Sequence, residues 1–238
     1  MSQVPDLPSA AADPSLPADI AGAPAQWWLR LGHDLRGPIA PMRMAVQMLR
    51  GGWVGPSEQE EALRMIDRQI DALLGSIEDV GELLRLHAGT FVFAAQDADL
   101  SALLDQVGQR SGLQRWLQER QRQLQVELPS QPVLARHDPQ RLGRLLEFLV
   151  RRAAIHSAPG ASLVLSLWPG EGRVHWRLTG SGPSLAKDPE LRLVAGETED
   201  LEECEPQALV VREVARRHDL QFTPLAAGEV GFSMAASA

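Results

Sequence analysis

Two apolar stripes with the period of an α-helix constrain the fold of this chain more than any other feature. The first runs through residues 28, 31, 35, 39, 42, 46 and 49, and the second runs from Leu63 to Leu84. Steps that alternate between three and four residues are typical of one face of an amphipathic helix. The segment RGGWVGPS between the stripes contains three glycines and a proline, which end a helix and form a turn. The sequence therefore predicts two antiparallel helices joined by a short connection.

A two-helix hairpin cannot bury a full apolar stripe on each helix by itself. Two hairpins packed together form a four-helix bundle, in which both stripes face a shared core. We therefore expect a homodimer through the hairpin.

The first predicted helix carries His33, which stands two residues from the stripe on either side. At about 100° per residue, two steps turn a side chain about 200° away from the stripe, so we expect the imidazole to point outward. Gly37, one turn on, leaves the approach to it open. Pro38 and Pro41 predict a kink there. Two interpretations remain open: a surface histidine in a bent helix, or an exposed nucleophile.

The charge of the chain is distributed unevenly. The net charge of -8 argues against a nucleic-acid-binding protein, which usually has a basic surplus. Residues 27–52 nevertheless contain four arginines and one aspartate. This basic helix is suited to attract an acidic or phosphorylated partner, and a solvated arginine face is the alternative. The four arginines are Arg30, Arg36, Arg43 and Arg50.

Cysteine usage and hydropathy indicate the compartment. The single cysteine, Cys204, cannot form an internal disulfide, and its surroundings do not suggest a zinc site. We therefore expect a reducing, cytoplasmic environment. No apolar run approaches the roughly 18 residues that span a bilayer, so we expect no membrane partner. Residues 1–25 are rich in Pro, Ala and Ser, and they are interpreted as a flexible tail.

The second part of the chain mixes strand and helix patterns. Six segments with β-branched or alternating apolar residues predict strands, and two periodic segments, 142–154 and 208–218, predict helices. This order indicates a two-layer α/β sandwich, with a mixed sheet under a helical layer. The whole chain is thus predicted to be α+β, with a tail at 1–25, a hairpin at 26–88 and a lobe at 89–238. The predicted strands are LQVELP (124–129), VLAR (133–136), SLVLSLW (162–168), VHWRLTG (174–180), QFTPLA (221–226) and VGFSMAA (230–236).

The string from His33 to Pro38, HDLRGP, resembles the H-box of sensor histidine kinases. In that family the dimerisation hairpin carries a phosphorylated histidine, and an ATP-binding lobe follows. The similarity extends over about residues 27–238, including VHWRLTGSGPSL as the central strand and nucleotide loop. The resemblance implies that His33 is the phosphoacceptor and that Asp34 orients the ring or takes a proton. Contact with phosphate or a receiver domain is assigned to Arg30, Arg36, Gly37 and Arg43.

Three segments depart from the family's nucleotide-binding pattern. Phe148 and Arg152 stand where the family has magnesium-binding asparagines, and neither side chain can bind a cation. The Asp-x-Gly-x-Gly loop is replaced by GSGPS, and Asp188 and Glu190 lie well past it. EPQA replaces the second glycine box, after a run of six carboxylates in residues 196–205. We therefore expect neither ATP nor a metal to bind here. The site residues predicted not to bind are Phe148, Arg152, Gly180, Gly182, Ser184, Glu205 and Gln207.

The retained histidine and the altered nucleotide segments together predict a phosphorelay. A histidine can accept phosphate from a response-regulator receiver, which brings its own acidic pocket and Mg²⁺. Gly37 occupies a position where many family members have Thr or Asn to place a hydrolytic water, so we expect weak phosphatase activity. The prediction is a histidine phosphotransferase that uses no ATP. The alternatives are a non-catalytic pseudokinase scaffold and an active kinase with an atypical nucleotide site.

Overall fold

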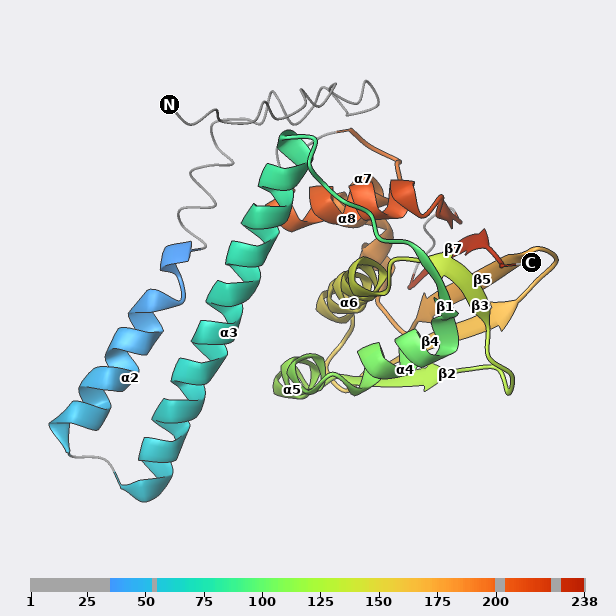
Figure 1. Cartoon of the computed structure of the whole chain (residues 1–238). Coiled ribbons are helices and arrows are strands. Elements are labelled where there is room, and N and C mark those ends of the chain that lie inside the picture. Colours follow the sequence, from blue (N-terminus) through green and yellow to red (C-terminus); the bar gives the residue numbers. More distant parts are fainter. Residues whose placement is uncertain (1–34, 53–54, 200–203, 224–227, 238) are drawn as a thin grey trace, which may run out of the picture. The chain divides into compact units, whose positions relative to one another are not determined.

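The computed structural model describes residues 35–52, 55–199, 204–223 and 228–237 (Figure 1). The chain divides into two compact units, Met1–Phe91 and Val92–Ala238. The first unit contains the helical hairpin, and the second contains the lobe. Each unit is taken by itself below.

The hairpin consists of α2 (Ile39–Gly51) and α3 (Pro56–His87). Gly52 follows α2 with a φ of +64°, a left-handed conformation that suits glycine and ends the helix. At the start of α3, the Gly55 N–H donates a hydrogen bond of 2.8 Å to Glu58 Oε2. Proline at the first position of α3 needs no N–H partner there. The predicted two-helix hairpin is therefore confirmed.

The predicted break near the proline pair is found at one of the two prolines. Leu35 and Arg36 are helical, Gly37 and Pro38 form a turn, and α2 begins at Ile39. Pro41 lies in the first turn of α2, and its nitrogen cannot donate to the carbonyl of Gly37 four residues before it. The interruption at Gly37 and Pro38 therefore agrees with the predicted kink.

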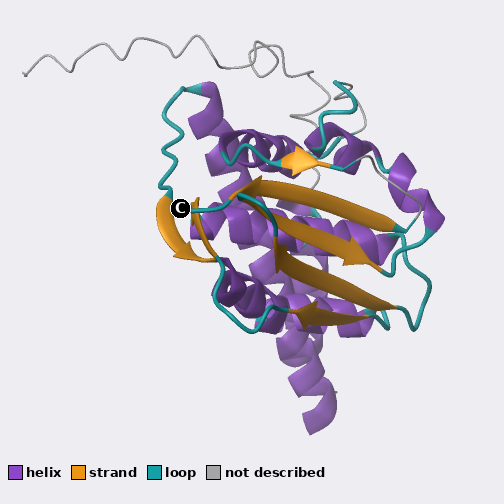
Figure 2. Ribbon diagram, turned by 90° about the vertical axis from the view of Figure 1, so that its right-hand side faces the viewer, coloured by secondary structure: helices purple, strands orange, loops and turns teal. Residues whose placement is uncertain are grey.

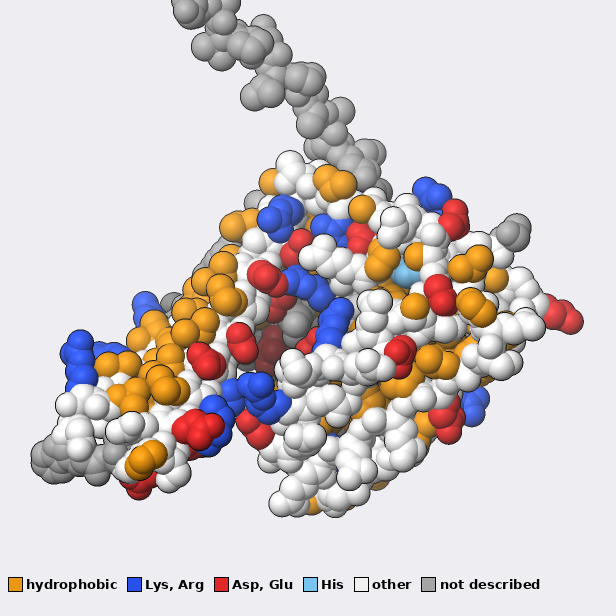
Figure 3. Space-filling view, turned by 60° about the horizontal axis from the view of Figure 1, so that its bottom comes forward, with side chains coloured by type: hydrophobic (Ala, Val, Ile, Leu, Met, Phe, Trp, Pro, Cys, Tyr) orange, Lys and Arg blue, Asp and Glu red, His pale blue; other side chains and the backbone are white. Residues whose placement is uncertain are grey.

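The apolar stripes of the hairpin remain largely uncovered within one chain. Ala45 and Ala62 are buried, while Ile39, Ile70 and Ile77 are 42%, 42% and 52% exposed. Figure 3 shows apolar side chains gathered along the hairpin. Single exposed apolar residues are ordinary, but a continuous row on a two-helix unit marks an interaction surface.

The lobe is built on a five-stranded mixed sheet with the order β2-β4-β5-β7-β6. β2 pairs in parallel with β4, and the other neighbours are antiparallel. A separate antiparallel ribbon pairs β1 (Gln96–Asp99) with β3 (Leu134–His137). The sheet strands are β2 (Gln123–Glu127), β4 (Ser162–Pro169), β5 (Arg173–Thr179), β6 (Gln221–Phe222) and β7 (Glu229–Ala235).

Helices cover one face of this sheet (Figure 2). Alternate residues of β4 and β5 are buried, and the five central residues of β7 are all buried. Trp176 stacks on Phe232 with ring centroids 4.9 Å apart. α6 contributes nine buried residues to the core. The helical elements of the lobe are α4 (Leu100–Gln109), α5 (Ser111–Glu119), α6 (Pro139–Ile155), the 3-10 helix η2 (Pro183–Lys187), α7 (Pro189–Val194) and α8 (Pro206–Arg217).

The predicted α+β class and the two-layer sandwich are confirmed. The predicted strand at 133–136 corresponds to β3, which lies in the ribbon and not in the main sheet. The strand predicted at 221–226 is confirmed at Gln221–Phe222, and residues 224–227 lie outside the described residues. α4, α5 and α7 were not predicted individually. Among the described helices, none is both long and apolar enough to cross a membrane.

Candidate functional site

The predicted phosphoacceptor lies outside the described residues, as do Asp34 and Arg30. Arg36 and Gly37, which follow directly, are exposed, and so is Arg43 on α2. A shallow groove of about 370 Å³ runs along α2. It combines apolar side chains of the stripe with guanidinium groups, a surface suited to a protein partner that carries negative charge. The groove is lined by Ile39, Met42, Arg43, Val46, Gln47 and Arg50.

In the lobe, the three altered nucleotide segments meet at one cluster of charged side chains. Arg152 near the end of α6 is its centre. Its Nε donates to Asp188 Oδ2 at 2.9 Å, and its Nη2 contacts the same oxygen. Its Nη1 lies 3.2 Å from Glu190 Oε2. Asp188 and Glu190 follow the GSGPS loop in the sequence. In the folded lobe, both of their side chains lie beside Arg152.

The loop that replaces the family's Asp-x-Gly-x-Gly is bound to the end of α6 through His156. The Gly182 N–H donates a 2.7 Å hydrogen bond to the His156 carbonyl. The His156 ring joins Ser184 Oγ, 2.9 Å from Nδ1, to Asp188 Oδ2, 2.6 Å from Nε2. Ser184 is therefore part of the same network.

The segment that replaces the second glycine box reaches the cluster through its backbone. The Glu205 N–H donates a long hydrogen bond of 3.4 Å to Glu190 Oε1. Gln207 lies half-buried in the first turn of α8, next to Pro206. Proline at this position removes one of the N–H groups that would otherwise face a ligand.

Phe148 does not join the cluster. Its side chain is 2% exposed and belongs to the buried side of α6. Four residues on, Arg152 reaches the cluster with a side chain that is only 18% exposed. One of the two positions expected to face a nucleotide is thus part of the apolar core.

Gly180 and Gly182 are required by backbone packing. Gly180 has a φ of +92°, and a Cβ there would lie 2.2 Å from the Ser162 carbonyl oxygen. A Cβ at Gly182 would lie 2.3 Å from the His156 carbonyl oxygen. Both distances are far below van der Waals contact, so both glycines have a structural reason that involves no ligand.

The pKa values of the two carboxyl groups beside Arg152 are shifted in opposite directions. Burial disfavours the charged form of Asp188, but hydrogen bonds from Arg152 and the Leu191 N–H outweigh it and lower its pKa. Burial, with repulsion from Glu205 and Asp188, raises the pKa of Glu190 to about 7 against the attraction of Arg152. Among the described residues, no group donates a hydrogen bond to Glu190 Oε2, although the guanidinium is close.

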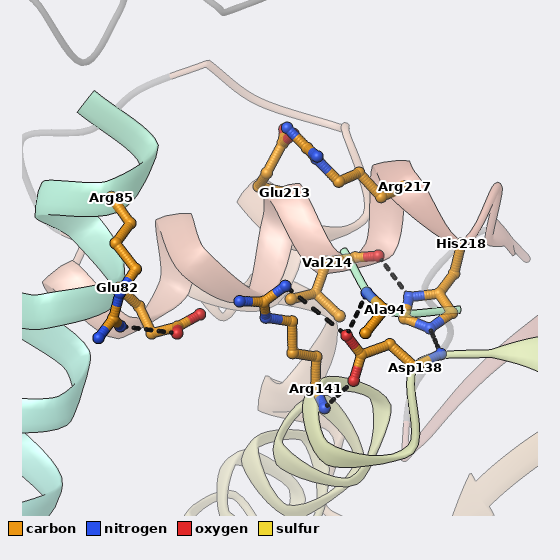
Figure 4. A network of polar contacts seen from close by, with 9 residues as sticks. All are labelled: Glu82, Arg85, Ala94, Asp138, Arg141, Glu213, Val214, Arg217 and His218. Carbon is orange, nitrogen blue, oxygen red and sulfur yellow. Dashed lines mark hydrogen bonds and ion pairs between the residues drawn. The ribbon is translucent and has the colours of Figure 1, made fainter. Parts of the chain in front are cut away.

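A second polar network, at the start of α6, is structural (Figure 4). Asp138 caps α6 by accepting from the Arg141 N–H at 3.1 Å, and it also accepts from the Ala94 N–H at 3.0 Å. The Asp138 N–H donates to His218 Nε2 at 3.0 Å, and Nδ1 of that ring lies 2.8 Å from the Val214 carbonyl. The ring is therefore neutral, with its proton on Nδ1. Burial lowers the pKa of His218, in agreement with this hydrogen-bond pattern.

Sequence reasoning missed His156, Asp188 and Glu190 as members of the site. A signal was present for one of them. Asp188 precedes a proline and accepts a 2.9 Å hydrogen bond from the Leu191 N–H, the signature of an N-cap. No sequence pattern indicated that the same carboxylate would reach Arg152.

Comparison with known proteins agrees with this arrangement. Residues 27–89 match the family model of the His Kinase A phospho-acceptor domain. The alginate biosynthesis sensor protein KinB of Pseudomonas aeruginosa is 29% identical over 143 residues, covering 59% of this chain and 24% of KinB. The chain spans 22–43% of the length of the curated relatives it matches.

Solved structures share the fold. The histidine kinase AdeS of Acinetobacter baumannii aligns with a TM-score of 0.58 at 19% identity, over 86% of this chain and 97% of AdeS. A bacterial phosphotransferase aligns with a TM-score of 0.51 at 17% identity, over 90% of this chain and 94% of that one. Histidine kinase ThkA, solved in complex with the response regulator TrrA, aligns with a TM-score of 0.56 at 14% identity, over 90% and 62%.

The hairpin with its phospho-acceptor match, the helix-covered sheet and these relatives agree with one another. Together they support a sensor histidine kinase family assignment, with residues 27–89 as the part that matches the phospho-acceptor domain of these two-component signalling proteins.

Proposed function

We propose that this protein is a histidine phosphotransferase that relays phosphoryl groups between His33 and the aspartates of response-regulator receivers, without using ATP. The observation that carries the proposal is the cluster around Arg152. It fills the counterpart of the nucleotide site with ion pairs of the protein's own side chains.

The chemistry requires little from the hairpin beyond an exposed imidazole. A ring nitrogen of His33 attacks the phosphorus of an aspartyl phosphate, forming an N–P bond as the O–P bond breaks. The receiver aspartate leaves as a carboxylate, and Asp34 takes the proton from the other ring nitrogen. Charge on the transferred group is neutralised by the Mg²⁺ of the receiver, and alignment comes from docking on α2.

The cluster also explains why ATP would bind poorly. A triphosphate needs unoccupied hydrogen-bond donors and a cation, but the guanidinium of Arg152 already bonds Asp188 and Glu190. Displacing it would leave two buried carboxylates facing an anion. Each such uncompensated charge costs about 3 kcal/mol or more.

The fold is compatible with a relay, since a solved bacterial phosphotransferase shares it over 90% of this chain, as histidine kinases also do. One further observation favours a relay. Gly37 has no oxygen or amide donor with which to hold a hydrolytic water beside a phosphorylated receiver. A protein that neither makes nor hydrolyses the phosphoryl group is suited to pass it on.

We also propose that the protein is a homodimer that acts in the cytoplasm. The exposed stripes of α2 and α3 support association of two hairpins into a bundle. The reducing environment suggested by the lone Cys204 and the expected receiver partners support the cytoplasmic setting.

The test uses receiver domains labelled with radioactive phosphate and the full chain. A relay transfers the label to the protein within seconds to minutes, and His33→Gln abolishes the transfer. Radioactive ATP with Mg²⁺ and no receiver leaves the protein unlabelled. Label acquired from ATP would indicate an active kinase. Binding of receivers without any label transfer would indicate a scaffold.

A further inference from the structure

The segment Gly182–Val194, here named the latch segment, is attached to the end of α6 by polar contacts, while its Leu185, Leu191, Leu193 and Val194 side chains are buried in the lobe core. Its backbone bonds the His156 carbonyl at Gly182, and its Ser184 and Asp188 side chains hold the His156 ring. Arg152 bonds Asp188 and faces Glu190. Two carboxylates of the latch segment thus share one guanidinium of α6.

The net charge of Arg152, Asp188 and Glu190 together depends on whether Glu190 carries a proton. With Glu190 protonated, Arg152 and Asp188 balance each other. With Glu190 ionised, two buried carboxylates share a single positive charge, and their side chains are 0% and 4% exposed. Glu205 adds a further negative charge beside Glu190, whose Oε2 receives no hydrogen bond from the described residues.

We propose that the latch segment is a proton-controlled closure of the lobe: it stays docked on α6 while Glu190 is protonated, and it is released when Glu190 loses its proton. Release lets both carboxylates leave the buried site together, because Asp188 and Glu190 lie on the same short element. The apolar side chains of α7 and η2 keep the docked state compact at lower pH.

The groups that face Glu190 come from three elements. α6 presents Arg152, the latch segment presents Asp188, and the start of α8 presents Glu205. His156, which directly follows α6, contacts Asp188 Oδ2 through its Nε2.

The raised pKa of Glu190, about 7 against an ordinary 4.5, sets the pH window. The docked state binds this proton more tightly than the released state, so raising the pH from about 4.5 through 7 favours release, and the effect levels off above that. For one linked proton, the opening equilibrium increases about tenfold between pH 6 and pH 8.

Hydrogen–deuterium exchange of the full chain tests the closure. After correction for intrinsic rates, amides of residues 185–194 should lose about tenfold of their protection between pH 6 and pH 8. Glu190→Gln keeps an uncharged group of the same shape, so its protection should be high and equal at both pH values. Glu171→Gln, an exposed residue in the β4–β5 turn, removes the same charge and should behave as the unaltered chain.

Two results would overturn the proposal. One is protection of residues 185–194 in the unaltered chain that does not change between pH 6 and pH 8. The other is a loss of protection in Glu190→Gln as large as in the unaltered chain. Since the first measurement uses no variant, it decides the matter even if Glu190→Gln folds poorly.

Discussion

At the scale of single residues, Arg152 distinguishes this lobe from one arranged to bind a nucleotide. A nucleotide-binding lobe leaves hydrogen-bond donors and metal-binding side chains available to the nucleotide. Here the guanidinium of Arg152 contacts the buried carboxylates of Asp188 and Glu190. Buried ion pairs contribute little net stability, but removing one partner is costly because the other charge stays behind. Removing any one of these charged side chains should therefore lower the stability of the folded lobe.

Arg152→Met tests this at the residue scale. It should lower the free energy of unfolding of the lobe by about 3 kcal/mol, because Asp188 and Glu190 lose the one guanidinium that contacts them among the described residues. Chemical denaturation at pH 6, where the latch segment is docked, measures the effect, and Arg115→Met, at an exposed position of α5, is the matched control. A loss no greater than that of the control would contradict the assigned role.

Gly180→Ala should destabilise the lobe by about 2 kcal/mol or more, since its Cβ would overlap the Ser162 carbonyl at a positive φ. Gly112→Ala is the control, because a Cβ there meets nothing within 4 Å. Because alanine favours a helix more than glycine does, Gly112→Ala in α5 should raise the free energy of unfolding by about 0.5–1 kcal/mol. Melting temperatures of the two variants should therefore move in opposite directions, and equal shifts would refute the packing argument.

His218 gives the lobe an acid-sensitive element. Its folded pKa lies below its ordinary 6.5 because the ring is buried, so its contribution is complete above that value and is lost as the pH falls below it. His218→Gln, which keeps polar atoms in the ring's place, should flatten the decline of lobe stability between pH 6.5 and pH 5. If the denaturation midpoint of His218→Gln falls with pH as steeply as that of the unaltered chain, His218 is not the source of the acid sensitivity.

At the scale of elements, α2 and α3 form the interface of the proposed homodimer. Within one chain they bury mainly alanines against each other and leave the larger apolar side chains of both stripes exposed. A surface of this kind is stable in water only when another surface covers it. A second hairpin provides that cover with the same residues on each side.

Ile70→Asp with Ile77→Asp should dissociate the homodimer, because two charges per chain would enter the bundle core. Sedimentation equilibrium should give the mass of one chain for this double variant and of two for the unaltered protein. Gly75→Asp adds a charge on the opposite side of α3, where a Cβ meets nothing, and should stay dimeric. A dimeric double variant would show that association uses another surface.

The elements differ in how far the sequence predicts them. The hairpin was predictable because its period persists over two long helices, and the β4–β5 pair because its strands alternate regularly. α7 has only six residues, too few for a period to be recognised. The Arg152 cluster was not predictable, since Arg152 and Asp188 lie 36 residues apart and meet only in the folded lobe, where α6 and α7 both pack against α8. The resemblance to the family located the altered segments, but not the ion pairs that join them.

At the scale of the whole molecule, a phosphoacceptor hairpin is combined with a lobe that keeps the family fold while its nucleotide segments bond to one another. In the proposed relay, the hairpin performs the chemistry and the lobe has a supporting role. The source of phosphate in such a relay is a phosphorylated partner. Transfer should depend on His33 and on docking at α2, and it should be indifferent to substitutions in the nucleotide segments that leave the lobe folded.

Label transfer to His33 tests the central claim most directly. The full-length protein is incubated in parallel with radioactive ATP and Mg²⁺, and with receiver domains that already carry radioactive aspartyl phosphate. The account predicts label on the protein only in the second reaction, and none there for His33→Gln. Label from ATP alone, or label from a receiver that persists in His33→Gln, would contradict it.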